Sequence, residues 1–237
     1  SLRNLATTDP QAQRRIFDVF MATNDPEMLE AAKECLYSLK DADLLQKIAD
    51  SMSSETNPDR RAALAFVLGM NLDSDIIRPL FEAILAGNDT RLQESALSRM
   101  CVQNVQRYAE FSARLVPQLR QMVMTGATPE VRARAATALR GDQSKEGVEF
   151  LIDRMNRDPD PNVQMKAMVA LPVTYSSGGP HSEEQIRALL AVATDESRSA
   201  QMRRWAADRV LMQTSIRNKE LVTEEQRAVL KAFAEKK

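Results

Sequence analysis

A repeated eleven-residue segment constrains the fold of this 237-residue chain more than any other feature. Six copies align without gaps, and they begin at Pro26, Pro58, Thr90, Pro129, Pro161 and Ala200. Successive starts are 32, 32, 39, 32 and 39 residues apart. A period of about 20–50 residues is the signature of a repeat protein, in which each unit buries its apolar face against the next.

The conserved columns within the copies predict helices. Six residues after the start stand one leucine and five alanines, namely Ala32, Leu64, Ala96, Ala135, Ala167 and Ala206. Ten residues after it stand Leu36, Leu68, Met100, Leu139, Leu171 and Val210. Positions two, six and ten lie close to one face of an α-helix, so these residues should face a core. The small middle residue lets neighbouring helices approach closely.

The residues around each start agree with a helix N-terminus. Proline suits the first helical turn, where its missing N–H is not needed. Good N-cap residues precede five of the starts, at Asp25, Asn57, Asp89, Thr128 and Asp160. Another helix-period segment precedes each copy. Two of these first helices are expected to carry an internal proline, Pro79 or Pro117, and such a residue costs about 3 kcal/mol and kinks a helix.

This alternation resembles the HEAT repeat family, including its PBS-lyase-type members. The best matches are TPEVRARAATALRG at 128–141 and DPNVQMKAMVALP at 160–172, and the resemblance covers about residues 9–214. It implies an all-α fold, a right-handed α-α superhelix (α-solenoid) of about six helix pairs with a C-terminal helix. We expect one domain over 1–237, with pairs near 9–39, 43–70, 74–106, 111–141, 144–172 and 182–214 and a closing helix at 223–236.

The two 39-residue intervals contain insertions around 102–110 and 172–182. Insertions in solenoids map to loops, often on the binding face. The second insertion holds Tyr175 and His181, which we take as candidate partner-binding residues; a tolerated surface loop is the alternative.

Catalytic and metal-binding motifs are scarce in the sequence. His181 is its single histidine, which leaves too few ligands for a His-based zinc or iron site. The HEAT-type iron hydroxylases carry His-Glu pairs in successive repeats, and this sequence has none. It also lacks the glycine-rich phosphate-binding motifs. We therefore expect no metal, no cofactor and no catalytic residue.

The cysteines and the tryptophan fit the repeat register. Cys35 and Cys101 fall in second helices two repeats apart, too far for a disulfide, and both are expected to be buried. Trp205 stands beside the small column and should be partly packed. Two unpaired thiols slightly favour the cytoplasm. Because the chain begins Ser1-Leu2, a location facing the cell envelope stays open if a preceding segment exists. No apolar run is long enough to span a bilayer.

Charge is uneven along the chain, although its net value is −1. Residues 24–59 hold nine Asp or Glu and three Lys, a net of −6, whereas 91–140 hold eight Arg and three Glu, a net of +5. Second helices of HEAT-like arrays line the concave surface, so basic residues near their starts are candidate partner contacts: Arg60, Arg91, Arg134, Lys166, Arg203 and Arg204. For the recurring column of Arg61, Arg132 and Arg203, a structural ladder with an Asp of the neighbouring repeat is the competing interpretation.

These features favour a non-catalytic scaffold or adaptor that binds a protein or peptide on its concave face. The alternatives are a nucleic-acid-binding protein similar to the HEAT-like DNA glycosylases, or an enzyme similar to the HEAT-like bilin lyases. Few aromatic residues and a near-neutral net charge argue against nucleic acid. The sequence gives no oligomeric state.

Overall fold

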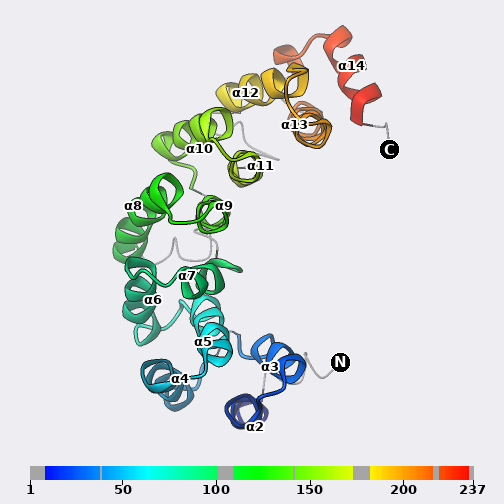
Figure 1. Cartoon of the computed structure of the whole chain (residues 1–237). Coiled ribbons are helices and arrows are strands. Elements are labelled where there is room, and N and C mark those ends of the chain that lie inside the picture. Colours follow the sequence, from blue (N-terminus) through cyan, green and yellow to red (C-terminus); the bar gives the residue numbers. More distant parts are fainter. Residues whose placement is uncertain are drawn as a thin grey trace. The chain divides into compact units, whose positions relative to one another are not determined.

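The computed structural model describes residues 9–37, 39–100, 109–140, 142–172, 182–215 and 219–234. All regular secondary structure in these residues is helical (Figure 1), which confirms the predicted all-α repeat fold. The chain divides into two compact units, Ser1–Ala138 (unit 1) and Leu139–Lys237 (unit 2). One continuous repeat domain over 1–237 remains a prediction.

Unit 1 contains four described helix pairs. They are α2 (Pro10–Ala22) with α3 (Pro26–Lys33), α4 (Ala42–Ser54) with α5 (Pro58–Met70), α6 (Ile77–Ala86) with α7 (Thr90–Leu97), and α8 (Ala109–Thr125) with α9 (Pro129–Ala138). Each second helix in this unit packs against the next, α3 on α5, α5 on α7 and α7 on α9.

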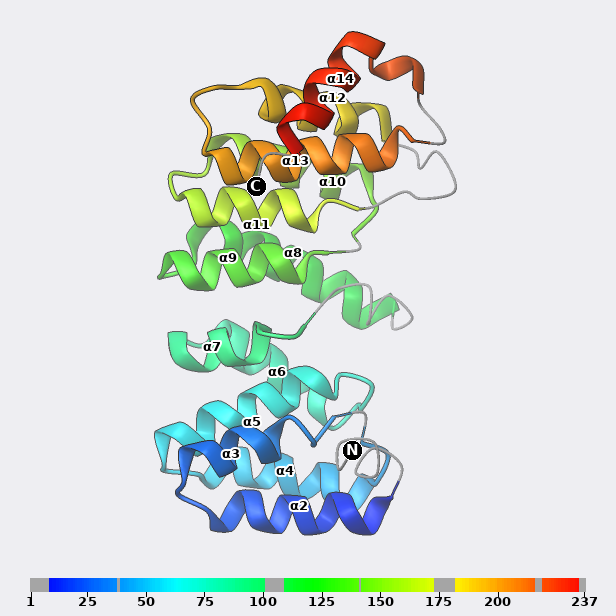
Figure 2. The same ribbon diagram turned by 90° about the vertical axis from the view of Figure 1, so that its right-hand side faces the viewer.

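Unit 2 contains two described pairs and a closing helix. The pairs are α10 (Lys145–Arg157) with α11 (Pro161–Ala170), and α12 (Ser182–Thr194) with α13 (Ala200–Gln213). A short 3₁₀ turn, η2 (Lys219–Leu221), leads to α14 (Glu224–Ala234), which packs on α13. Figure 2 shows α11 and α13 running side by side.

The six second helices begin at the six residues where the sequence copies align. The predicted N-caps form as hydrogen bonds to free backbone N–H groups of the first turn. The side chain of Asp25 accepts from Glu27 (3.0 Å), Asn57 from Asp59 (2.9 Å), Asp89 from Leu92 (3.1 Å), Thr128 from Val131 (3.1 Å) and Asp160 from Asn162 (2.9 Å). Local chemistry therefore fixes where each of these helices starts.

The two prolines of the first helices differ in position. Pro117 lies inside α8, as expected. Pro79 does not, because α6 starts at Ile77 rather than near residue 74 and Pro79 is its third residue. A proline in the first turn removes no intrahelical hydrogen bond, so the kink expected at Pro79 has no cause.

The two repeat columns form the core, as predicted. All six residues of the small column and all six of the large column are buried. Burial of a leucine-sized side chain stabilises the fold by about 1.5–3 kcal/mol, so the large column holds each pair against its neighbour.

Candidate functional site

The fourth residue of three second helices has a structural role. These three side chains donate hydrogen bonds to carbonyl oxygens at the end of the first helix of their own pair. The donors and acceptors are Gln93 to Leu85 (3.0 Å) and Gly87 (2.7 Å), Gln164 to Asp158 (2.6 Å), and Arg203 to Ala193 (3.3 Å). The last carbonyls of a helix lack intrahelical partners, so these three side chains cap the first helix of their pair.

Arg203 is therefore engaged inside the fold. Besides donating to Ala193, its guanidinium lies 4.5 Å from the ring centroid of Phe233 on the closing helix. The sequence suggested that this column pairs with an aspartate of the neighbouring repeat. Arg203 instead contacts a backbone carbonyl and an aromatic ring. It joins α12 and α14 to α13.

Three arginines of the basic segment form ion pairs with carboxylates of other repeats in unit 1. These pairs are Arg91 with Asp59, Arg99 with Glu34 (3.1 Å) and Arg114 with Glu82 (2.9 Å). Hydrogen bonding to Glu82 is the main cause that raises the pKa of Arg114. Acidic and basic residues far apart in sequence neutralise each other locally.

Arg60 is half-buried against the preceding helix pair. Its side chain is 14% exposed, its Nη1 donates to the carbonyl of Met21, and its Nη2 donates to Asn24 Oδ1 at 2.8 Å. Its Nε lies 3.4 Å from the carboxylate of Glu55. Arg60 therefore joins the α2–α3 turn to the α4–α5 turn, and these contacts engage its guanidinium within the fold.

The other candidates do not form one cluster. Arg91 and Arg134 belong to unit 1, and Arg134 pairs within its own helix with Glu130 at 2.7 Å. Lys166 and Arg204 belong to unit 2, where Lys166 is exposed and Arg204 half-buried. Lys166 makes no ion pair with the described residues. Tyr175 and His181 lie outside the described residues.

An exposed stripe on α13 is the most distinctive surface of unit 2. Trp205 is 42% exposed and Met212 is 39% exposed, and Gln201 and Asp208 are also exposed. These four residues fall at i, i+4, i+7 and i+11, which is one face of a helix. Trp205 is thus partly packed, as expected, yet presents much of its ring to solvent.

The closing helix leaves this stripe uncovered. Arg227 near the start of α14 donates to Thr214 Oγ1 at 3.2 Å, and Phe233 near its end stacks on Arg203. Since Thr214 follows α13 and Arg203 lies near its start, α14 runs antiparallel along α13.

Lys166 is an exposed residue of α11 at the same helical position as Trp205 of α13. Both residues are fifth after the start of their helices, and the helices are aligned because Arg209 of α13 donates to the carbonyl of Leu171 at the end of α11. This register places Lys166 and the Trp205 stripe at the same level of the two helices, and we call these exposed residues of α11 and α13 the α11–α13 face.

Other parts of the described chain provide no further candidate site. Its residues contain no group of three or more His, Cys, Asp or Glu placed to hold a metal ion. Within them, no helix has the length and apolarity needed to cross a membrane. Cys35 is a free thiol and only half-buried, whereas Cys101 lies outside the described residues.

A shallow hollow between α2 and α4 has a volume of about 270 Å³. It is lined by Arg14, Phe17, Asp18, Asp43, Leu44 and Lys47. Arg14 is already paired with Asp41 at 2.5 Å, a hydrogen bond that holds the pKa of Asp41 below its usual range. The lining of the hollow carries two basic and two acidic side chains, so the hollow favours neither an anionic nor a cationic ligand.

Comparisons with known proteins agree with the repeat. No curated protein matches the sequence significantly. Among solved structures, human deoxyhypusine hydroxylase in complex with glycerol is similar at 15% identity, over 100% of this chain and 88% of that chain, with a TM-score of 0.37. A likeness that weak does not bear on activity. The family model for HEAT repeats matches residues 116–212, and this part of the chain is therefore a run of HEAT repeats.

Proposed function

We propose that the chain is a non-catalytic scaffold that binds a protein or peptide on the α11–α13 face. One observation carries this proposal: Trp205 is exposed on a helix that packs against α12 and α14 and is hydrogen-bonded to the end of α11. Tryptophan is enriched among the residues that dominate binding energy in protein interfaces. Met212 lies two helical turns further along the stripe, and Asp208 stands between it and Trp205, while Lys166 of α11 carries the opposite charge.

Nucleic-acid binding has less support. Its basis in the sequence was the arginine-rich segment, and Arg91, Arg99 and Arg114 all pair with carboxylates of earlier repeats. An arginine that is already neutralised releases fewer counterions on meeting a phosphate backbone.

An enzymatic function also has less support. The whole sequence holds one histidine, and carboxylates such as Asp25, Asp89 and Asp160 act as helix caps. We therefore include no catalytic step in the proposed function.

Affinity capture from extracts of the source organism, with immobilised protein, tests the proposal. A stoichiometric protein partner should be retained by the parent chain and lost with Trp205→Ala and Lys166→Glu. Arg187→Ala is the matched control, because Arg187 is an exposed unit 2 arginine that pairs only with Glu183 of its own helix at 2.6 Å. Recovery of the same partner with Trp205→Ala would contradict this choice of surface, and recovery of none with the parent would contradict the scaffold itself.

A further inference from the structure

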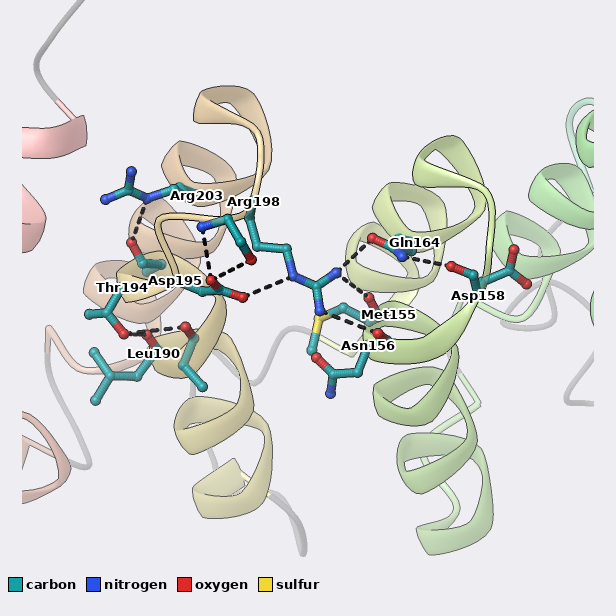
Figure 3. A network of polar contacts seen from close by, with 12 residues as sticks. Met155, Asn156, Asp158, Gln164, Leu190, Thr194, Asp195, Arg198 and Arg203 are labelled. Atoms are coloured by element: carbon teal, nitrogen blue, oxygen red, sulfur yellow. Dashed lines mark hydrogen bonds and ion pairs between the residues drawn. The ribbon is translucent and has the colours of Figure 1, made fainter.

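Arg198 joins the two helix pairs of unit 2, and the sequence did not single it out. It lies in the turn between α12 and α13, and Figure 3 shows its guanidinium directed at the preceding pair. Nη1 donates to Gln164 Oε1 at 2.6 Å and to the carbonyl of Met155 at 3.3 Å, and Nη2 donates to the carbonyl of Asn156 at 3.3 Å. The side chain is 18% exposed.

The acceptors explain why an arginine occupies this position. Met155 and Asn156 belong to the last turn of α10, whose carbonyls lack helical partners and carry the negative end of the helix dipole. A planar guanidinium can donate in several directions at once, which a lysine ammonium at the end of a flexible stem cannot match. Arg198 thus caps the first helix of one repeat from the turn of the next.

Both ends of this link are themselves fixed. On its own side, Arg198 Nε donates to Asp195 Oδ2 at 3.2 Å, and Asp195 also accepts from the backbone and hydroxyl of Ser197 (3.0 and 2.6 Å). The Ser197 hydroxyl is the main cause that lowers the pKa of Asp195, so this carboxylate stays ionised at neutral pH. On the other side, Gln164 is held by its bond to Asp158.

A second link holds the opposite end of the same helices. Arg209 donates to the carbonyl of Leu171, and Gln213 donates to that of Pro172 at 3.5 Å. Arg198 precedes α13 and Arg209 lies in its last turns, about 15 Å further along a helix that rises about 1.5 Å per residue. Lys166 and Trp205 lie between the two links.

We infer that Arg198 is a positioning residue for the α11–α13 face: it sets the register of α13 against α11 and so holds Trp205 beside Lys166. This inference rests on the proposed function for its biological meaning. The register itself needs no partner to be measured, because Trp205 is the single tryptophan of the chain.

The test uses the quenching of a bimane label by tryptophan, which acts only at short range. The label is attached to Lys166→Cys in a background with Cys35→Ser and Cys101→Ser, and Trp205→Phe gives the unquenched reference. We expect strong quenching in this parent, a loss of quenching toward the reference with Arg198→Ala, and an intermediate value with Arg198→Lys. Arg187→Ala should leave quenching unchanged.

Far-UV circular dichroism separates a register change from unfolding. If Arg198→Ala loses helix content, Arg198→Lys, which keeps the charge and the stem, carries the test. Parent-level quenching in a folded Arg198→Ala or Arg198→Lys chain would overturn the inference. Because this readout involves no partner, its result is independent of whether the face binds a protein.

Discussion

Helices α5 and α13 occupy the same place in their repeats and have opposite surroundings. In α5, every residue from Ala62 to Gly69 is buried, including Phe66 at 5% exposure. In α13, the residues at the positions of Ala63 and Phe66 are Trp205 and Asp208, and both are exposed. One repeat position therefore serves packing in unit 1 and supplies a free surface in unit 2.

The difference arises from the residues of α3 and α7 that contact α5. Lys33 of α3 lies 4.6 Å from the ring centroid of Phe66, and the next residue, Glu34, pairs with Arg99 beyond the end of α7. That ion pair joins residues 65 positions apart, two repeats away from each other. On the α7 side, Gly69 lets the helix touch the backbone of Ala96. The close approach at Gly69 and the contact of Lys33 with Phe66 thus bury α5 between α7 and α3.

The largest contrast should appear when the two aromatic residues are truncated. Phe66→Ala removes a core ring and should lower the free energy of unfolding by about 3–5 kcal/mol. Trp205→Ala removes a ring that is only partly buried and should cost about 1–2 kcal/mol. Urea unfolding followed by far-UV circular dichroism measures both, since the second variant lacks the fluorophore. Equal losses would break the comparison by making Trp205 a core residue.

The second-largest loss of stability is expected when one methyl group is added at the contact of α5 with α7. In Gly69→Ala the new Cβ would overlap the carbonyl oxygen of Ala96, so we expect a loss of up to about 3 kcal/mol despite the better helix propensity of alanine. Gly87→Ala is the control, because its Cβ would lie 3.4 Å from the nearest atom, an ordinary contact. A thermal midpoint for Gly69→Ala at or above that of the parent would show that α5 is not tightly held.

Two adjacent arginines of α5 sharpen the comparison further. Arg60→Ala leaves the Met21 carbonyl and Glu55 without this donor and should cost about 1–3 kcal/mol. Arg61→Ala alters an exposed side chain and should change stability by less than about 0.5 kcal/mol. Chemical denaturation followed by Trp205 fluorescence is not suitable, since that probe reports unit 2, so circular dichroism is used. If both variants lose the same stability, burial of Arg60 is not what distinguishes them.

The smallest effect belongs to the ion pair that spans α5. Arg99 is 56% exposed, so a double-mutant cycle of Glu34→Ala and Arg99→Ala should give a coupling energy of about 0.2–1 kcal/mol. The coupling should shrink in 1 M NaCl, where the Debye length falls to about 3 Å. A coupling that salt leaves unchanged would mean that packing, rather than charge, joins the two ends.

The sequence was sufficient for the helices and the core, since these depend on local chemistry. Prolines and N-cap residues marked the second-helix starts, and the small and large columns identified the buried positions. It placed the start of α6 too early, because the residues from Ser74 form a turn in which the Ser74 hydroxyl accepts from the backbone N–H of Ile76 (3.2 Å), and the helix begins at Ile77. Only the structure showed that Pro79 falls in a first turn.

The surface could be predicted much less well. Counting charges by segment suggested a basic binding region, whereas the charges pair between neighbouring repeats. A usable signal existed: Arg91 and Asp59 are 32 residues apart, as are Arg114 and Glu82, and Arg198 and Gln164 are 34 apart. Polar residues one repeat length apart are natural neighbours in a stack. The burial of α5 has no such signal, because it depends on how closely α5 approaches its two neighbouring helices.

The pair of Glu34 with Arg99 has a consequence for how unit 1 unfolds. Repeat proteins are usually described as a chain of units in which each unit is coupled to its nearest neighbours alone. Here the first and third pairs touch across the second, so removing α3 uncovers Phe66 and also takes away a partner of α7. Loss of the end repeat therefore weakens two others at once. Because the pair is worth only about 0.2–1 kcal/mol, removing the first pair should weaken the third by that small amount, in addition to its larger effect on the second.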